Sequence, residues 1–85
     1  MKNGIIYHRN ISSAMFVVEL DQGTYTVFES FSINEFHIGD QISGALGQLG
    51  TIVTLNATTH KTGTVIVRKI NATLDEAMDY ANLTQ

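Results

Sequence analysis

Residues 14–31 read AMFVVELDQGTYTVFESF, and this stretch decides the fold class. Ala14–Leu20 is rich in β-branched and aromatic residues, and Thr24–Phe31 alternates polar and apolar side chains. Between them, residues 21–23 (DQG) fit a three-residue hairpin turn in which Gly23 takes a positive φ. The stretch therefore predicts a β-hairpin.

Shorter strand-like segments flank this hairpin and are separated by turn residues at Gly39-Asp40 and at His60–Gly63. Closely spaced short strands predict a mainly all-β, OB-like barrel of five or six strands. A closed barrel also removes sheet edges, which a chain without proline has few other means to protect. The flanking segments are Gly4–His8, Gln41–Leu46, Thr51–Ala57 and Thr64–Ile70.

The C-terminal segment changes to a helical period. Residues 73–76 (TLDE) fit a capping box, in which Thr73 caps the helix and Glu76 reaches back. Apolar residues then recur on one helical face, which predicts a helix over about 74–83. A helix this short is marginal alone, so we expect it to dock on the barrel. The apolar face consists of Leu74, Ala77, Met78 and Ala81.

Length and composition favour one domain spanning residues 1–85. So short a chain builds only a modest core, with little room for a deep substrate pocket, so we do not expect an enzyme. The chain has no cysteine, and no apolar run is long enough for a membrane span or a signal peptide. We therefore expect a cytoplasmic protein without disulfides and without a membrane partner.

The string AMFVVELDQG at residues 14–23 resembles the second strand and turn of bacterial translation initiation factor one and, more loosely, S1-type RNA-binding modules. Gly4 and the Gly39-Asp40 pair match that family's opening glycine and later turn, so the resemblance covers about residues 4–56. It implies an OB-fold barrel. The family carries Lys and Arg where residues 32–37 read SINEFH, and it lacks the last hairpin and helix. The resemblance therefore implies the fold more strongly than RNA binding.

Three apolar residues of the hairpin form the first candidate binding surface. If Phe16 and its alternate neighbours face the core, Met15 and Val17 face outward, and Phe28 on the next strand lies on the same side. Such an outer face carries stacking aromatics in nucleic-acid-binding OB-folds. It could instead bind a protein, or the C-terminal helix could cover it.

Basic residues form the second candidate surface. Between Asn10 and His60 the chain has no Lys or Arg, and its net charge is −3. A barrel could gather the remaining bases on one face, as nucleic-acid binding requires, or leave them as ordinary solvated charges. The candidate residues are Arg9, Lys61, Arg68 and Lys69, together with Lys2, and His8 and His60 lie nearby in the sequence.

Sequence motifs for chemistry are weak. His8, His37 and His60 lack metal-ligand spacing, so no metal or cofactor is expected. His37 and Asp40 could form a pair, but an ordinary turn histidine is the more common case. Residues 44–50 (GALGQLG) contain two G-x-x-G units without a basic residue, which a bend at a barrel corner explains better than a nucleic-acid clamp. We predict a non-enzymatic interaction module that binds a protein; the alternative is single-stranded nucleic acid.

Overall fold

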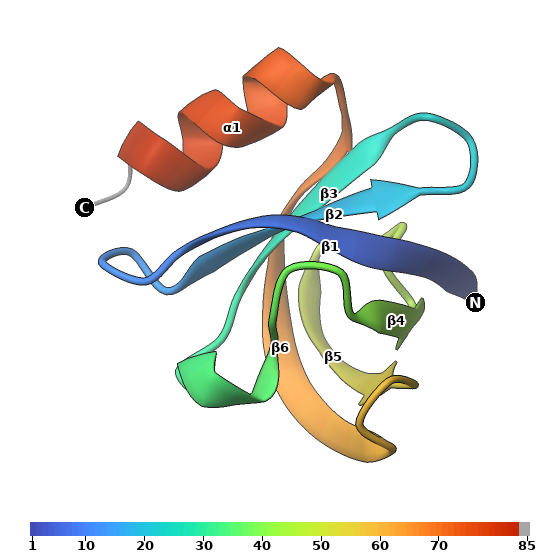
Figure 1. The fold of residues 1–85 in the computed structure, drawn as a ribbon. Helices are drawn as coiled ribbons and strands as arrows, with labels where there is room; N and C mark the ends of the chain where they lie inside the picture. Colours follow the sequence, from blue (N-terminus) through green and yellow to red (C-terminus); the bar gives the residue numbers. More distant parts are fainter. Residues whose placement is uncertain (84–85) are drawn as a thin grey trace.

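The structure is a computed structural model that describes residues 1–83, apart from the side chains of Ile33 and Leu83. It forms a closed antiparallel barrel in the order β1-β2-β3-β6-β5-β4, with β4 pairing back to β1 (Figure 1). This confirms the predicted mainly β barrel with a C-terminal helix. The elements are β1 (Lys2–Asn10), β2 (Met15–Leu20), β3 (Tyr25–Glu29), η1 (Ile33–Glu35), β4 (Gln41–Gly44), β5 (Gly50–Asn56), β6 (Lys61–Ala72) and α1 (Leu74–Leu83).

The turn between β2 and β3 forms where the sequence predicts it. Gly23 has a φ of 78°, and its backbone N–H donates to the Leu20 carbonyl at 3.1 Å. An L-residue side chain disfavours this left-handed conformation, which explains the glycine.

The last hairpin turns earlier than predicted. Its turn occupies residues 57–60, and Gly63 lies within β6 opposite Thr54. Asn56 sets this position because its side-chain oxygen accepts the backbone N–H groups of Thr58 and Thr59 at 3.1 and 3.3 Å. The predicted turn at His60–Gly63 is therefore wrong.

An aromatic cluster fills the barrel interior. The Phe16 and Phe28 rings stack with centroids 5.2 Å apart, and Phe36 meets them edge-on at 5.5 and 5.2 Å. Phe36 comes from the connection between β3 and β4, so it anchors that connection to the core. Ile42 and Leu46 point inward, as the sequence predicts.

A second core lies between α1 and the outer face of β2 and β3. Ala77 and Ala81 are fully buried against Val17 and Val27, because alanines allow the helix to approach closely. The helix contacts β1, β2, β3 and β6, and Figure 1 shows it lying across one side of the barrel. The expected docking of the helix is confirmed.

Hydrogen bonds hold both ends of α1. At its start, the Thr73 N–H donates to Glu76 Oε1 at 2.9 Å and the Glu76 N–H donates to Thr73 Oγ1 at 3.2 Å, which confirms the capping box. Near its end, the Ala81 carbonyl accepts hydrogen bonds from Asn10 Nδ2 and Ser13 Oγ at 3.2 and 2.9 Å. The β1–β2 turn thus fixes the helix on the barrel.

Thr73→Ala should lower the free energy of unfolding by about 1 kcal/mol, the usual cost of losing an N-cap side chain. The Thr73 N–H also lowers the pKa of the Glu76 carboxyl below its ordinary value of 4.5. Because the pKa of Glu76 is lower in the folded state than in the unfolded state, the ionised Glu76 carboxylate stabilises the folded protein. This stabilisation is present above the unfolded-state pKa and is lost as the pH falls through the folded-state pKa. Urea denaturation followed by circular dichroism measures both effects. A Glu76→Gln variant that is as stable as the native protein at neutral pH would contradict the second.

Candidate binding face

The structure buries the apolar residues of the first candidate surface. Met15 and Val17 have exposed fractions of 6% and 0%, and they lie beneath α1. The helix therefore covers this face, which was one of the alternatives that the sequence left open.

Phe28 points into the barrel, so its predicted outward orientation is wrong. Its neighbour Thr26 also points inward, where its hydroxyl donates to the Leu46 carbonyl at 2.8 Å. A satisfied hydroxyl can lie in a core, so Thr26 did not mark a solvent-facing side of β3. The outward side of β3 carries Tyr25 and Val27, which the helix covers.

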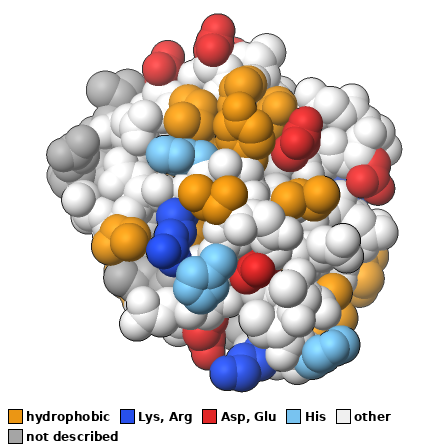
Figure 2. All heavy atoms as spheres, in the orientation of Figure 1, with side chains coloured by type: hydrophobic (Ala, Val, Ile, Leu, Met, Phe, Trp, Pro, Cys, Tyr) orange, Lys and Arg blue, Asp and Glu red, His pale blue; other side chains and the backbone are white. Residues whose placement is uncertain are grey.

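The structure spreads the basic residues of the second candidate surface along the strands. Lys61 and Lys69 lie eight residues apart on β6, at most about 26 Å along the strand at 3.3 Å per residue. Arg68 is paired with Glu29, whose Oε1 accepts from Nε at 3.0 Å and from Nη2 at 2.6 Å. Arg9 donates from Nη1 to the Phe36 carbonyl at 3.0 Å. On the side seen in Figure 2, Lys and Arg form separate small patches rather than a stripe.

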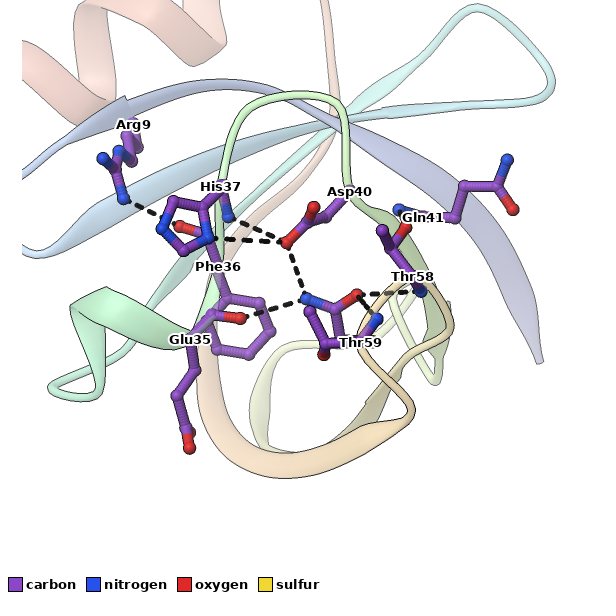
Figure 3. A network of polar contacts seen from close by, with 9 residues as sticks. Arg9, Glu35, Phe36, His37, Asp40, Gln41, Thr58 and Thr59 are labelled. Carbon is purple, nitrogen blue, oxygen red and sulfur yellow. Dashed lines mark hydrogen bonds and ion pairs between the residues drawn. The ribbon is translucent and has the colours of Figure 1, made fainter.

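A polar network joins the β3–β4 connection to the β5–β6 turn (Figure 3). Asn56 is 2% exposed and donates from Nδ2 to Asp40 Oδ2 at 2.8 Å and to the Glu35 carbonyl at 3.0 Å. Asp40 Oδ2 also accepts the His37 N–H at 3.0 Å, and the His37 ring Nδ1 lies 3.9 Å from it. His37 and Asp40 thus belong to one turn, in which the Asp40 N–H also donates to the His37 carbonyl at 3.0 Å. These hydrogen bonds join residues of the network to one another, so we assign the network a structural role.

A groove of about 440 Å³ lies on the outer side of the β1–β4 pair. The surface is hollow here because Ile42 points inward, a side chain on Gly4 would also point inward, and the outward Ser43 is small. Asp21 is the charged residue among those that line it. The complete lining is Asn3, Gly4, Ile5, Asp21, Gln41, Ile42, Ser43 and Ala57.

Exposed apolar side chains flank β4 on both sides. Ile5 of β1 is 46% exposed, and Val53 and Leu55 of β5 are 65% and 41% exposed. Register places Ile5 opposite Gln41, and Leu55 opposite Ser43. We call these five outward residues, Ile5, Gln41, Ser43, Val53 and Leu55, the β4 face. In the described part of the chain, α1 contacts neither β4 nor β5, so the helix leaves this side open.

From Val53 to Asn56, the strand β5 has an inverted polarity. Its inward side chains are Ile52, Thr54 and Asn56, whereas Val53 and Leu55 point to solvent. An ordinary half-buried strand places its apolar residues inward. The inward polar groups are satisfied, since Thr54 Oγ1 donates to the Gly63 carbonyl at 3.2 Å and Asn56 belongs to the polar network.

The strands β4 and β5 also carry no formal charge. Between Asp40 and Lys61 the sequence has no Asp, Glu, Lys or Arg. The cores of protein–protein interfaces are depleted in charged residues in the same way. The β4 face is therefore an uncharged, partly apolar surface beside a groove.

The candidate surfaces predicted from the sequence do not include the β4 face, because the resemblance implies a binding surface on the second and third strands. The charge-free stretch between Asp40 and Lys61 was a visible signal. The inversion of β5 was not visible, because residues 51–56 (TIVTLN) hold apolar side chains at both alternate positions.

No protein-family model, curated protein or solved structure matches this chain. Among the described residues, no helix is long and apolar enough to cross a membrane. Within the same residues, no three His, Asp or Glu side chains are grouped to hold a metal ion.

Proposed function

We propose that this protein is a non-enzymatic binding module that contacts a protein partner through the β4 face. The inverted polarity of β5 carries this proposal. The strand exposes Val53 and Leu55 while it buries Thr54 and Asn56. A partner that covers both exposed side chains would gain on the order of 1 kcal/mol from each, since burial of a whole side chain of this size yields about 1.5–3 kcal/mol.

Single-stranded nucleic acid is the alternative that the resemblance to initiation factor one and S1-type modules supports. Those OB-folds bind through the face of their second and third strands. Here α1 packs on the corresponding face, over Val17 and Val27. The bases are separated along their strands, and Glu29 neutralises Arg68. These observations favour a protein partner.

Site-specific photo-crosslinking tests the proposal in cells that produce the protein. The crosslinker p-benzoylphenylalanine replaces Val53 in one variant and Ile11 in a matched control. Ile11 is similarly exposed, at 54% against 65%, but lies in the β1–β2 turn. We expect protein adducts from position 53 and few from position 11. Equal yields, or no protein adduct from position 53, would contradict the proposal.

An amide chemical-shift titration with short RNA and DNA oligonucleotides tests the alternative. We expect no salt-dependent shifts around Arg9, Lys61 and Arg68. Binding through these residues would weaken steeply as salt rises, because the nucleic acid releases counterions when it binds cations. Such shifts would favour the nucleic-acid function over the proposed one.

A further inference from the structure

We infer that the partner contributes an extended strand that pairs with a free edge of β6, an inference that rests on the proposed function. The strand β6 pairs with β5 through residues 61–67 and with β3 through residues 66–72. The part of β6 nearest its hairpin turn therefore has a neighbouring strand on one edge only. The strands of a barrel are staggered, so a closed barrel can still leave part of a strand unpaired at its end. In Figure 1 this part of β6 continues beyond the end of β3.

The backbone groups on this edge belong to Thr62 and Thr64. Successive residues of an antiparallel strand direct their N–H and C=O groups to opposite edges. Gly63 faces β5, where its carbonyl accepts a hydrogen bond from Thr54 Oγ1 at 3.2 Å. Thr62 and Thr64 therefore face the other edge, on the side of β3. We call these two residues the β6 edge.

The strand β3 does not reach the β6 edge. Its last residue, Glu29, pairs with Ile66, and the chain then turns away into η1. In the part of the chain that the structure describes, the backbone groups of Thr62 and Thr64 have no hydrogen-bond partner. Both residues are exposed. Two N–H and two C=O groups are thus available to a partner.

An extended chain is the partner that satisfies these groups. A strand added to a sheet edge supplies donors and acceptors at the same spacing, as in other proteins that bind peptides in this way. Edges that must stay free usually carry charges or proline, whereas the β6 edge has neither and Lys61 lies only at its hairpin end. All pairs in the barrel are antiparallel, so we assign the same direction to the added strand.

The β6 edge is continuous with the β4 face. Register places Thr62 opposite Leu55 and Thr64 opposite Val53. The outward side chains of an added strand would therefore extend the surface that these apolar residues begin. The edge thus explains how a partner of the β4 face is held in place.

Charge specifies one residue of the added strand. Glu35 Oε1 lies 3.8 Å from the position that a Cβ atom on Gly63 would occupy. Figure 3 shows the Glu35 side chain pointing away from Asp40, and among the described residues Glu35 forms no ion pair. We therefore expect a basic residue opposite Gly63. Threonine or another β-branched residue suits the positions opposite Thr62 and Thr64, since such cross-strand pairs are favourable.

Binding of a synthetic strand to the full chain tests the inference. The probe is a capped seven-residue peptide that alternates threonine and valine, with lysine in place of the central valine. Its addition to the isotope-labelled protein should shift the Thr62 and Thr64 amide signals and slow their hydrogen exchange. A matched peptide with central glutamate should bind about fivefold more weakly, the scale of an exposed ion pair. The variant Glu35→Gln should remove this difference.

Two methylated forms of the lysine peptide show whether the contact is a strand. In an antiparallel pair, the two threonines beside the lysine bond to Thr62 and Thr64, whereas the valines direct their N–H groups to the opposite edge. N-methylation of those two threonines should therefore abolish binding. N-methylation of the two valines is the matched control and should leave the Kd unchanged.

The remaining outcomes separate this inference from the proposed function. Absence of shifts at Thr62 and Thr64, or equal binding of the two methylated peptides, would overturn the inference. Exchange of these amides that slows as the concentration of the protein alone rises would assign the β6 edge to a second copy, and would also overturn it. In each case the proposed function stands if position 53 still yields protein adducts, and both fail if it does not.

Discussion

Gly4→Ala should lower the free energy of unfolding by about 3 kcal/mol or more, the upper range for overpacking a core. A methyl group on Gly4 would lie 2.5 Å from Val18 Cγ1, 2.7 Å from the Glu19 carbonyl oxygen and 2.9 Å from Leu20 Cδ2. The carbonyl is backbone and cannot rotate away as a side chain does. Relief would require β1 to move, yet Gly4 pairs with Leu20 of β2 and with Ile42 of β4.

Gly63→Ala is the matched control for this substitution. Gly63 also lies within a strand, but its added methyl group would have Phe36 Cζ as its nearest neighbour, at an ordinary 3.5 Å. This variant should be as stable as the native protein or slightly more so, because alanine restricts the unfolded chain. Urea denaturation of the three proteins measures the differences. Equal stability of the two variants would show that β1 can shift to admit a side chain at position 4.

Local signals account for what could be predicted from the sequence. The β2–β3 turn depends on Gly23, and the start of α1 depends on Thr73 and Glu76; each acts through hydrogen bonds within a few residues. The turn and the helix start can therefore each be predicted from a few consecutive residues. The barrel could be predicted because several such turn signals separate short strand-like segments in the sequence.

The orientation of side chains could not be predicted in the same way. Both sides of β3 are buried, one in the barrel and one beneath α1, so Thr26 and Val27 are both 0% exposed. Alternation identifies a buried side only where the other side meets water. Thr26 therefore suggested a solvent-facing side of β3, but neither side of this strand faces solvent.

The candidate site depended on contacts between segments distant in sequence. Thr54 and Asn56 can face inward only because Gly63, Glu35 and Asp40 supply hydrogen-bond partners there. Those partners fix the register of β5, and this register turns Val53 and Leu55 outward. The polar network and the exposed apolar ridge are thus two consequences of one strand orientation.

Asn56→Ala should therefore have a large effect, lowering the free energy of unfolding by about 3–5 kcal/mol. The variant removes both Nδ2 hydrogen bonds, to Asp40 and to Glu35, and both Oδ1 hydrogen bonds from the β5–β6 turn. It leaves the Asp40 carboxylate, which is 8% exposed, without one of its donors. A buried polar group that loses its partner pays the cost of desolvation, which exceeds the net value of the hydrogen bond.

Two further variants distinguish the loss of the polar network from the loss of an asparagine side chain in general. Asn34→Ala removes an exposed asparagine from η1 and should leave stability within about 0.5 kcal/mol of the native protein. Asn56→Asp keeps an acceptor for Thr58 and Thr59 but places a second carboxylate beside Asp40. It should be as unstable as Asn56→Ala at neutral pH, because two carboxylates of like charge then face each other where Asn56 Nδ2 donated to Asp40 Oδ2. Urea denaturation gives the three values. Hydrogen exchange should show faster exchange of the His37 amide in both Asn56 variants, and of the Thr58 amide in Asn56→Ala. If Asn56→Ala is as stable as Asn34→Ala, the network does not fix the orientation of β5, and the exposed ridge has another cause.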